Sequence, residues 1–97
     1  MDEMEPSLKR GGGLIMKTLR VYDNPKYNDR YTVLVPNYRL DTGEIFLDIL
    51  SVTEGGGTAF CGDWRGGSTK GLGKRIQYSD LPAEIRGAIK SRLLQDH

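Results

Sequence analysis

Residues 44–52, EIFLDILSV, form a strand-length segment that is apolar on both of its faces. Ile45, Leu47 and Ile49 make up one row of side chains, and the other row is apolar too, interrupted only by Asp48. A strand at an edge usually alternates apolar and polar residues, whereas a strand buried on both faces does not. We therefore expect residues 44–52 to be an interior strand of a small sheet.

Two further segments with strand character precede this one. Residues 30–36, RYTVLVP, have the clearest strand pattern in the chain, with successive side chains expected on opposite faces. Residues 17–23, KTLRVYD, alternate apolar and polar side chains as well. Residues 23–29 carry Asn, Pro and Asp, and residues 41–43 read DTG, so both connections have the composition of turns. Connections this short join antiparallel neighbours, because a parallel crossover needs about a dozen residues or more.

The segments downstream complete the pattern. Residues 58–64, TAFCGDW, and 74–78, KRIQY, read as short strands, and residues 79–97 read as a helix that Ser79 or Asp80 caps, with a proline in its first turn. The apolar residues with helical spacing are Leu81, Ile85, Ala88, Ile89 and Leu93. This stripe needs a sheet to pack against. The pattern predicts an α+β fold in which an antiparallel sheet of three to five strands packs against one C-terminal helix.

Composition restricts the class of protein. The net charge is +1, which argues against binding polyanions through the field of the whole molecule. Cys61 is the only cysteine and His97 the only histidine, so neither a disulfide nor a structural zinc site is possible within the chain, and no cofactor is indicated. No apolar run reaches the roughly 20 residues of a membrane span, and no signal peptide is recognisable. We expect a cytoplasmic protein that does not bind membranes.

The first fifteen residues have no strand or helix periodicity and contain three consecutive glycines. We interpret residues 1–15 as a disordered tail, and residues 16–97 as a single domain. The codons of Lys9–Gly13 can form a purine-rich run like a bacterial ribosome-binding site, with Met16 at a suitable distance. One hypothesis is therefore that translation starts at Met16; the alternative is an ordinary flexible tail. Neither places a function there.

A glycine-rich segment, residues 55–75, lies between the strands and the helix and contains eight glycines, a tryptophan and four cations. Phosphate binding is one interpretation, because consecutive glycines let backbone N–H groups form an anion-binding concavity. A P-loop is excluded: in the pattern G-x-x-x-x-G-K-[ST], Ser68 stands at the first glycine and Arg75 replaces the Ser or Thr that holds magnesium.

Two other interpretations of this segment stay open. For nucleic-acid contact, Trp64 would stack on an unpaired base and the cations would bind phosphates, helped by aromatic residues on or beside the strands, namely Tyr22, Tyr27, Tyr31 and Tyr38. For a structural connection or protein contact, Trp64 would fill the end of the core or act as a binding hot spot together with Arg65. The cations concerned are Arg65, Lys70, Lys74 and Arg75.

Catalytic residues are hard to assign. The only histidine partner for Cys61 is the last residue of the chain, so we interpret Cys61 as a buried structural cysteine. Asp48 and Glu54 are the candidates for carboxylate chemistry, since one interrupts an apolar strand and the other borders the glycines. The simpler interpretation is that Asp48 lies at an edge and faces water. We expect no enzymatic activity; a hydrolase that uses Asp48 or Glu54 is the third hypothesis.

Two stretches, RVYDNPKYNDRYTVLV and LGKRIQYSDLPAEIR, resemble a loose group of short, uncharacterised proteins of bacteriophages and other mobile elements. Asp29–Val33, Leu72–Ile76 and Asp80–Pro82 match its pattern, whereas the middle of the chain, TEGGGTAFCGDWRGG, departs from it. The group has no established activity. The resemblance implies a phage or mobile-element origin and a place of action in the bacterial cytoplasm.

These observations predict a small non-enzymatic binding module that engages a host protein, and inhibits a defence system or other host factor, through its glycine-rich segment. The residues expected to bind are Trp64, Arg65, Lys70, Lys74 and Arg75. The alternative is weak binding of nucleic acid or nucleotide phosphates by the same residues. The chain would be a monomer, or a dimer through an open strand edge, for which residues 30–36 are the candidate.

Overall fold

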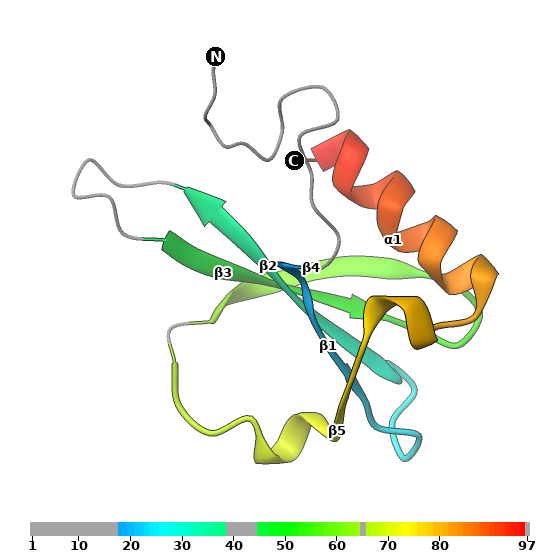
Figure 1. Ribbon diagram of the computed structural model, residues 1–97, viewed down its shortest axis with the longest axis horizontal. Coiled ribbons are helices and arrows are strands. Elements are labelled where there is room, and N and C mark those ends of the chain that lie inside the picture. Colours follow the sequence, from blue (N-terminus) through cyan, green and yellow to red (C-terminus); the bar gives the residue numbers. More distant parts are fainter. Residues whose placement is uncertain (1–17, 39–44, 65, 97) are drawn as a thin grey trace.

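A computed structural model describes residues 18–38, 45–64 and 66–96 (Figure 1). The tail at 1–15, the turn at 41–43 and the terminal His97 lie outside the described residues. The described part contains five antiparallel strands and one α-helix, so the predicted α+β fold is confirmed. The elements are β1 (Arg20–Asp23), β2 (Tyr31–Tyr38), β3 (Ile45–Val52), β4 (Thr58–Trp64), β5 (Lys74–Ile76) and α1 (Ala83–Asp96).

The strands lie in the order β4-β3-β2-β1-β5. β2, β3 and β4 are each antiparallel to the strand before them, as short turns require, and β3 is an interior strand as predicted. The expectation that residues 30–36 form an open edge is wrong, because β2 pairs with β1 on one side and β3 on the other. The edges of the sheet are β4 and β5. The part of the glycine-rich segment that connects these two strands therefore passes from one edge of the sheet to the other.

The core lies between α1 and one face of the sheet (Figure 1). Val21, Val33 and Leu50 from three neighbouring strands pack with Ile85 and Ile89 of the helix, and all five are at most 2% exposed. Complete burial of one such side chain contributes about 1.5–3 kcal/mol to stability. The apolar stripe predicted for the helix is thus the side that meets the sheet. Within the described residues, no helix has the length and apolar character needed to cross a membrane.

The helix begins later than its predicted caps. Its first turn is closed by the Arg86 N–H, which donates to the carbonyl of Pro82 at 3.0 Å, so Pro82 takes the capping position. Ser79 and Asp80 belong to a separate 3₁₀ turn, η3 (Tyr78–Asp80), and the prediction that one of them caps the helix is wrong. The cause is Pro82 itself, because a proline forces the residue before it, Leu81, into an extended conformation that interrupts the helix.

Candidate binding surface at the β5 edge

The predicted binding residues do not form one cluster. Trp64 is the last residue of β4 and is half-buried opposite Leu47, whereas Lys74 and Arg75 begin β5. These strands are the two edges of the sheet, so four strand spacings, or about 19 Å, separate them. Arg65 lies outside the described residues. The candidate surface is therefore the β5 edge with its cations, and Trp64 is not part of it.

Lys70 is held near this edge by the end of the β1–β2 hairpin. It opens a short 3₁₀ turn, η2 (Lys70–Leu72), and the side-chain amide of Asn24 donates to the carbonyl of Gly71 at 3.4 Å. Leu72 and Thr32 line the same small pocket of about 380 Å³, so η2 and the start of β2 face one another across it. This part of the glycine-rich segment thus places cations beside β5.

Gly73 explains how the chain turns from η2 into β5. Its φ is +99°, a conformation that side-chain-bearing residues rarely adopt. A Cβ atom at this position would also collide with the backbone carbonyl of Asp23. The last glycine of the segment is therefore needed for backbone approach, and it sets where Lys74 and Arg75 emerge.

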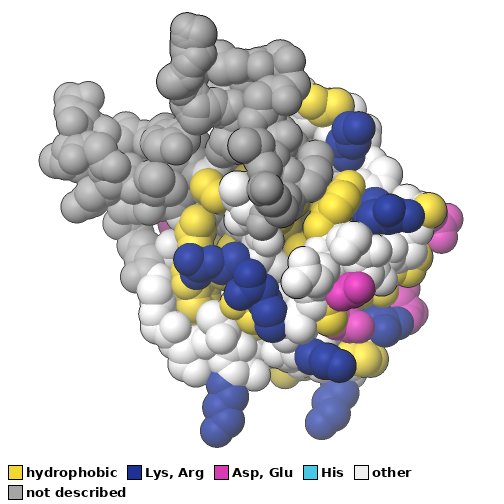
Figure 2. All heavy atoms as spheres, in the orientation of Figure 1, with side chains coloured by type: hydrophobic (Ala, Val, Ile, Leu, Met, Phe, Trp, Pro, Cys, Tyr) yellow, Lys and Arg dark blue, Asp and Glu magenta, His cyan; other side chains and the backbone are white. Residues whose placement is uncertain are grey.

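The cations at this edge are exposed, and their charge is not neutralised locally. Among the described residues, none of Lys70, Lys74 and Arg75 makes an ion pair. The guanidinium of Arg75 lies over the ring of Tyr22, 5.6 Å from its centroid, which fixes its direction without cancelling its charge. Figure 2 shows Lys and Arg side chains at the centre and lower edge of one face, away from the Asp and Glu side chains, which lie at its right among further Lys and Arg side chains.

A groove of about 490 Å³ runs beside the cations, lined by Leu19 and by residues 74–80. Its apolar surface comes from Leu19, Ile76 and Tyr78, which are buried or half-buried. The Tyr78 hydroxyl donates to the carbonyl of Arg86 at 2.8 Å, and burial raises the pKa of Tyr78 above its ordinary value. The ring is thereby fixed between the groove and α1.

The backbone of β1 decides which groups of β5 remain free. The Asn24 N–H donates to the Arg30 carbonyl at 2.8 Å, opposite it in the β1–β2 register. In an antiparallel ladder, successive residues direct their backbone groups alternately to one neighbour and to the other. Val21 and Asp23 therefore direct their N–H and C=O groups away from β2 and toward β5.

The partners of those two residues on β5 are Ile76 and Lys74, so the backbone groups of Arg75, between them, point outward. At Gln77 the edge is closed again by η3: its N–H donates to the Asp80 carboxylate at 3.0 Å and its carbonyl accepts from the Asp80 N–H at 2.9 Å. One N–H and one C=O, both of Arg75, are thus presented to a partner on the free side of β5.

The opposite edge is protected. Arg92 of α1 donates from Nη1 to the carbonyl of Thr58 at 3.1 Å and to its hydroxyl at 3.3 Å, and its guanidinium lies over the ring of Phe60. Further along β4 a bulge interrupts the ladder opposite Ile49 and Leu50. Side-chain cover and bulges are two ways in which proteins prevent pairing at an exposed strand.

Two residues considered for catalysis occupy different positions from those expected. Asp48 is half-buried on the interior strand β3, so its expected place at an edge is wrong. Cys61 is exposed on β4, with its sulfur 3.0 Å from the Ser51 hydroxyl. The expectation of a buried cysteine is wrong because the preceding residue, Phe60, packs on the core, so Cys61 lies on the opposite face of the sheet. In the part of the chain that the structure describes, no three His, Cys, Asp or Glu side chains are grouped as for a metal ion.

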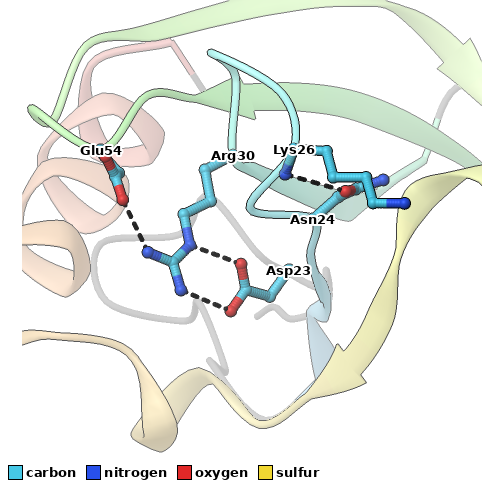
Figure 3. A network of polar contacts seen from close by, with 5 residues as sticks. All are labelled: Asp23, Asn24, Lys26, Arg30 and Glu54. Carbon is cyan, nitrogen blue, oxygen red and sulfur yellow. Dashed lines mark hydrogen bonds and ion pairs between the residues drawn. The ribbon is translucent and has the colours of Figure 1, made fainter.

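Glu54 takes part in a structural network. Figure 3 shows Arg30 between two carboxylates: its Nε and Nη2 donate to Asp23 at 2.7 and 3.1 Å, and its Nη1 donates to Glu54 at 2.7 Å. These hydrogen bonds raise the pKa of Arg30, with Asp23 as the larger cause. The network ties the β1–β2 hairpin to the β3–β4 turn. Neither Asp48 nor Glu54 lines the groove or the smaller pocket.

Sequence reasoning missed the groove, because its walls come from residues far apart in the chain. Leu19 precedes β1, whereas Gln77 and Ser79 follow β5, and only the pairing of β1 with β5 brings them together. No family model, curated protein or solved structure matches this chain.

Proposed function

We propose that this chain is a small non-enzymatic binding module, and that its contact surface consists of Lys70, Lys74, Arg75 and the adjoining groove. The observation that carries the proposal is the group of cations that form no ion pair with any described residue, beside a strand edge that no other described strand covers. Unneutralised cations beside an apolar hollow suit a partner that presents carboxylates around an apolar residue. In support of a non-enzymatic role, the groove contains no pair of carboxylates; its only acid, Asp80, already accepts a hydrogen bond from Gln77.

The partner that we propose is a protein rather than a nucleic acid. Single-stranded nucleic acid needs exposed aromatic rings on which its bases stack. Tyr22 and Tyr31 are only 5% and 4% exposed, and Trp64 lies on the other edge of the sheet. Tyr27, at 61%, is the exposed tyrosine among those described, so a stacking platform is lacking in that part of the chain.

The resemblance to phage and mobile-element proteins favours a protein of the bacterial host as this partner. The matching residues include Leu72–Ile76, which contains the start of β5. A host defence protein or other host factor in the cytoplasm is the class that we propose.

The experiment is capture from a nuclease-treated bacterial extract by immobilised protein at moderate salt. We expect wild type to retain a discrete host protein that the double variant Lys74→Glu/Arg75→Glu does not retain. Lys90→Glu, an exposed cation on α1, is the control for charge alone and should behave as wild type. If only nucleic acid is retained before nuclease treatment and nothing after it, the phosphate-binding alternative replaces this proposal.

A further inference from the structure

Resting on the proposed function, we infer that the partner contributes an extended segment that lies antiparallel along the free side of β5, and in which one aliphatic residue is followed by two acidic residues. Addition of an extended segment to an open sheet edge is a recurrent mode of peptide recognition, in which main-chain hydrogen bonds give affinity and pockets for alternate side chains give specificity. Three features of this edge define the segment.

The first feature is the backbone of Arg75. Its N–H and C=O point outward, while both backbone groups of Gln77 are occupied by Asp80. One residue of an antiparallel segment can therefore form a pair of hydrogen bonds with Arg75. The ladder cannot continue past Ile76, so the contact is short and has to be supplemented by side chains.

The second feature is charge. Lys74 and Arg75 are consecutive on β5, so their side chains lie on opposite faces of the sheet, and Lys70 is held near the start of the strand. Carboxylates on both faces of the incoming segment would each meet a cation. A second copy of this chain pairing through β5 would instead bring these cations against one another, which disfavours self-association here.

The third feature is the groove of about 490 Å³ with its apolar floor of Leu19, Ile76 and Tyr78. The groove lies at the end of β5 that follows Arg75. A side chain next to the residue that pairs with Arg75 can enter it, and an aliphatic group of valine or isoleucine size would cover apolar surface there. Because the groove follows Arg75 and the segment is antiparallel, the residue opposite Ile76 is aliphatic, and the next two residues, opposite Arg75 and Lys74, are acidic.

The test uses the full chain and the peptide acetyl-Glu-Glu-Val-Asp-Glu-Thr-Glu-amide in an amide NMR titration with hydrogen exchange. Its valine is to enter the groove, its central aspartate is to pair with Arg75, and the following glutamate is to meet Lys74. In the free protein the Arg75 amide should exchange faster than those of Lys74 and Ile76, which face β1. Saturating peptide should shift Leu19 and residues 74–79 and slow exchange of the Arg75 amide by about tenfold or more, as expected for a newly protected amide. A peptide N-methylated at its central aspartate lacks the N–H that would donate to the Arg75 carbonyl, and it should not protect the Arg75 amide.

Charge variants test the contribution of the cations to peptide binding. Lys74→Glu/Arg75→Glu should weaken peptide binding by about tenfold or more, whereas Lys90→Glu should leave it unchanged. Equal binding of the N-methylated peptide, or shifts elsewhere, would overturn strand addition and leave the proposed function standing. Absence of any shift overturns the inference alone if a host protein is captured as described above; if neither occurs, both proposals fail.

Discussion

Gly73 is the residue on which the position of the cations depends most. Its φ is +99°, a Cβ atom there would collide with the Asp23 carbonyl, and η2 ends and β5 begins on either side of it. Gly71, two residues earlier, has open space around it and no such backbone angle. The two glycines lie in the same segment of the sequence, but only one of them is required by the packing.

We predict that Gly73→Ala lowers the free energy of unfolding by about 2 kcal/mol or more, because it adds backbone strain and a collision with the carbonyl. Urea denaturation of both variants measures this, and Gly71→Ala should stay within about 0.5 kcal/mol of wild type. Equal loss in the two variants would mean that the approach of Gly73 to Asp23 is not the reason for the glycine.

The burial of Tyr78 makes the stability of the fold depend on pH. Because burial raises its pKa in the folded chain, ionisation is more favourable in the unfolded chain. The neutral Tyr78 hydroxyl therefore contributes fully to the free energy of unfolding below the tyrosine pKa of the unfolded chain, about 10. This contribution is lost as the pH rises through the higher pKa of the folded chain. Tyr78→Phe should cost about 1 kcal/mol near neutral pH through the lost hydrogen bond to Arg86, and the difference should shrink above about pH 10. A difference that does not change with pH would contradict this account.

At the scale of elements, the two edge strands have different roles. The cations on β5 form the proposed contact, whereas β4 carries Trp64 at its end and is covered at its start by Arg92. We predict that Trp64→Ala leaves capture of the partner within about twofold of wild type. Binding energy is concentrated in residues near the centre of an interface, and Trp64 lies on the opposite edge of the sheet from the proposed contact. Loss of capture in this variant, with the fold intact by NMR, would move the functional surface to β4.

The sequence predicted the elements well where local pattern decides them. The bounds of β4, residues 58–64, agree with the prediction, and the alternation around Val33 and the stripe through Ile89 placed the core. What it could not predict depends on contacts between distant segments. The pairing of β5 with β1 separates Trp64 from the cations and creates the groove, and no local signal marks that pairing.

For the whole molecule, the arrangement predicts a monomer. Arg92 and a bulge obstruct β4, while β5 is only three residues long and is cationic, so neither edge favours a second copy. Sedimentation at a low and a high concentration should give the 10.8 kDa monomer at both. A dimer that Lys74→Glu/Arg75→Glu abolishes would show that β5 binds another copy of this chain.

The central claim, that the edge of β5 with its groove is the contact surface, is tested most directly by site-specific photo-cross-linking. A benzophenone side chain placed at Ser79, an exposed residue of the groove, is compared with the same group at Lys90 on α1 and at Trp64 on β4. In nuclease-treated bacterial extract we predict a discrete cross-linked host protein from position 79 and none from positions 64 and 90. A product from position 64 or 90 but not from position 79 would contradict the account.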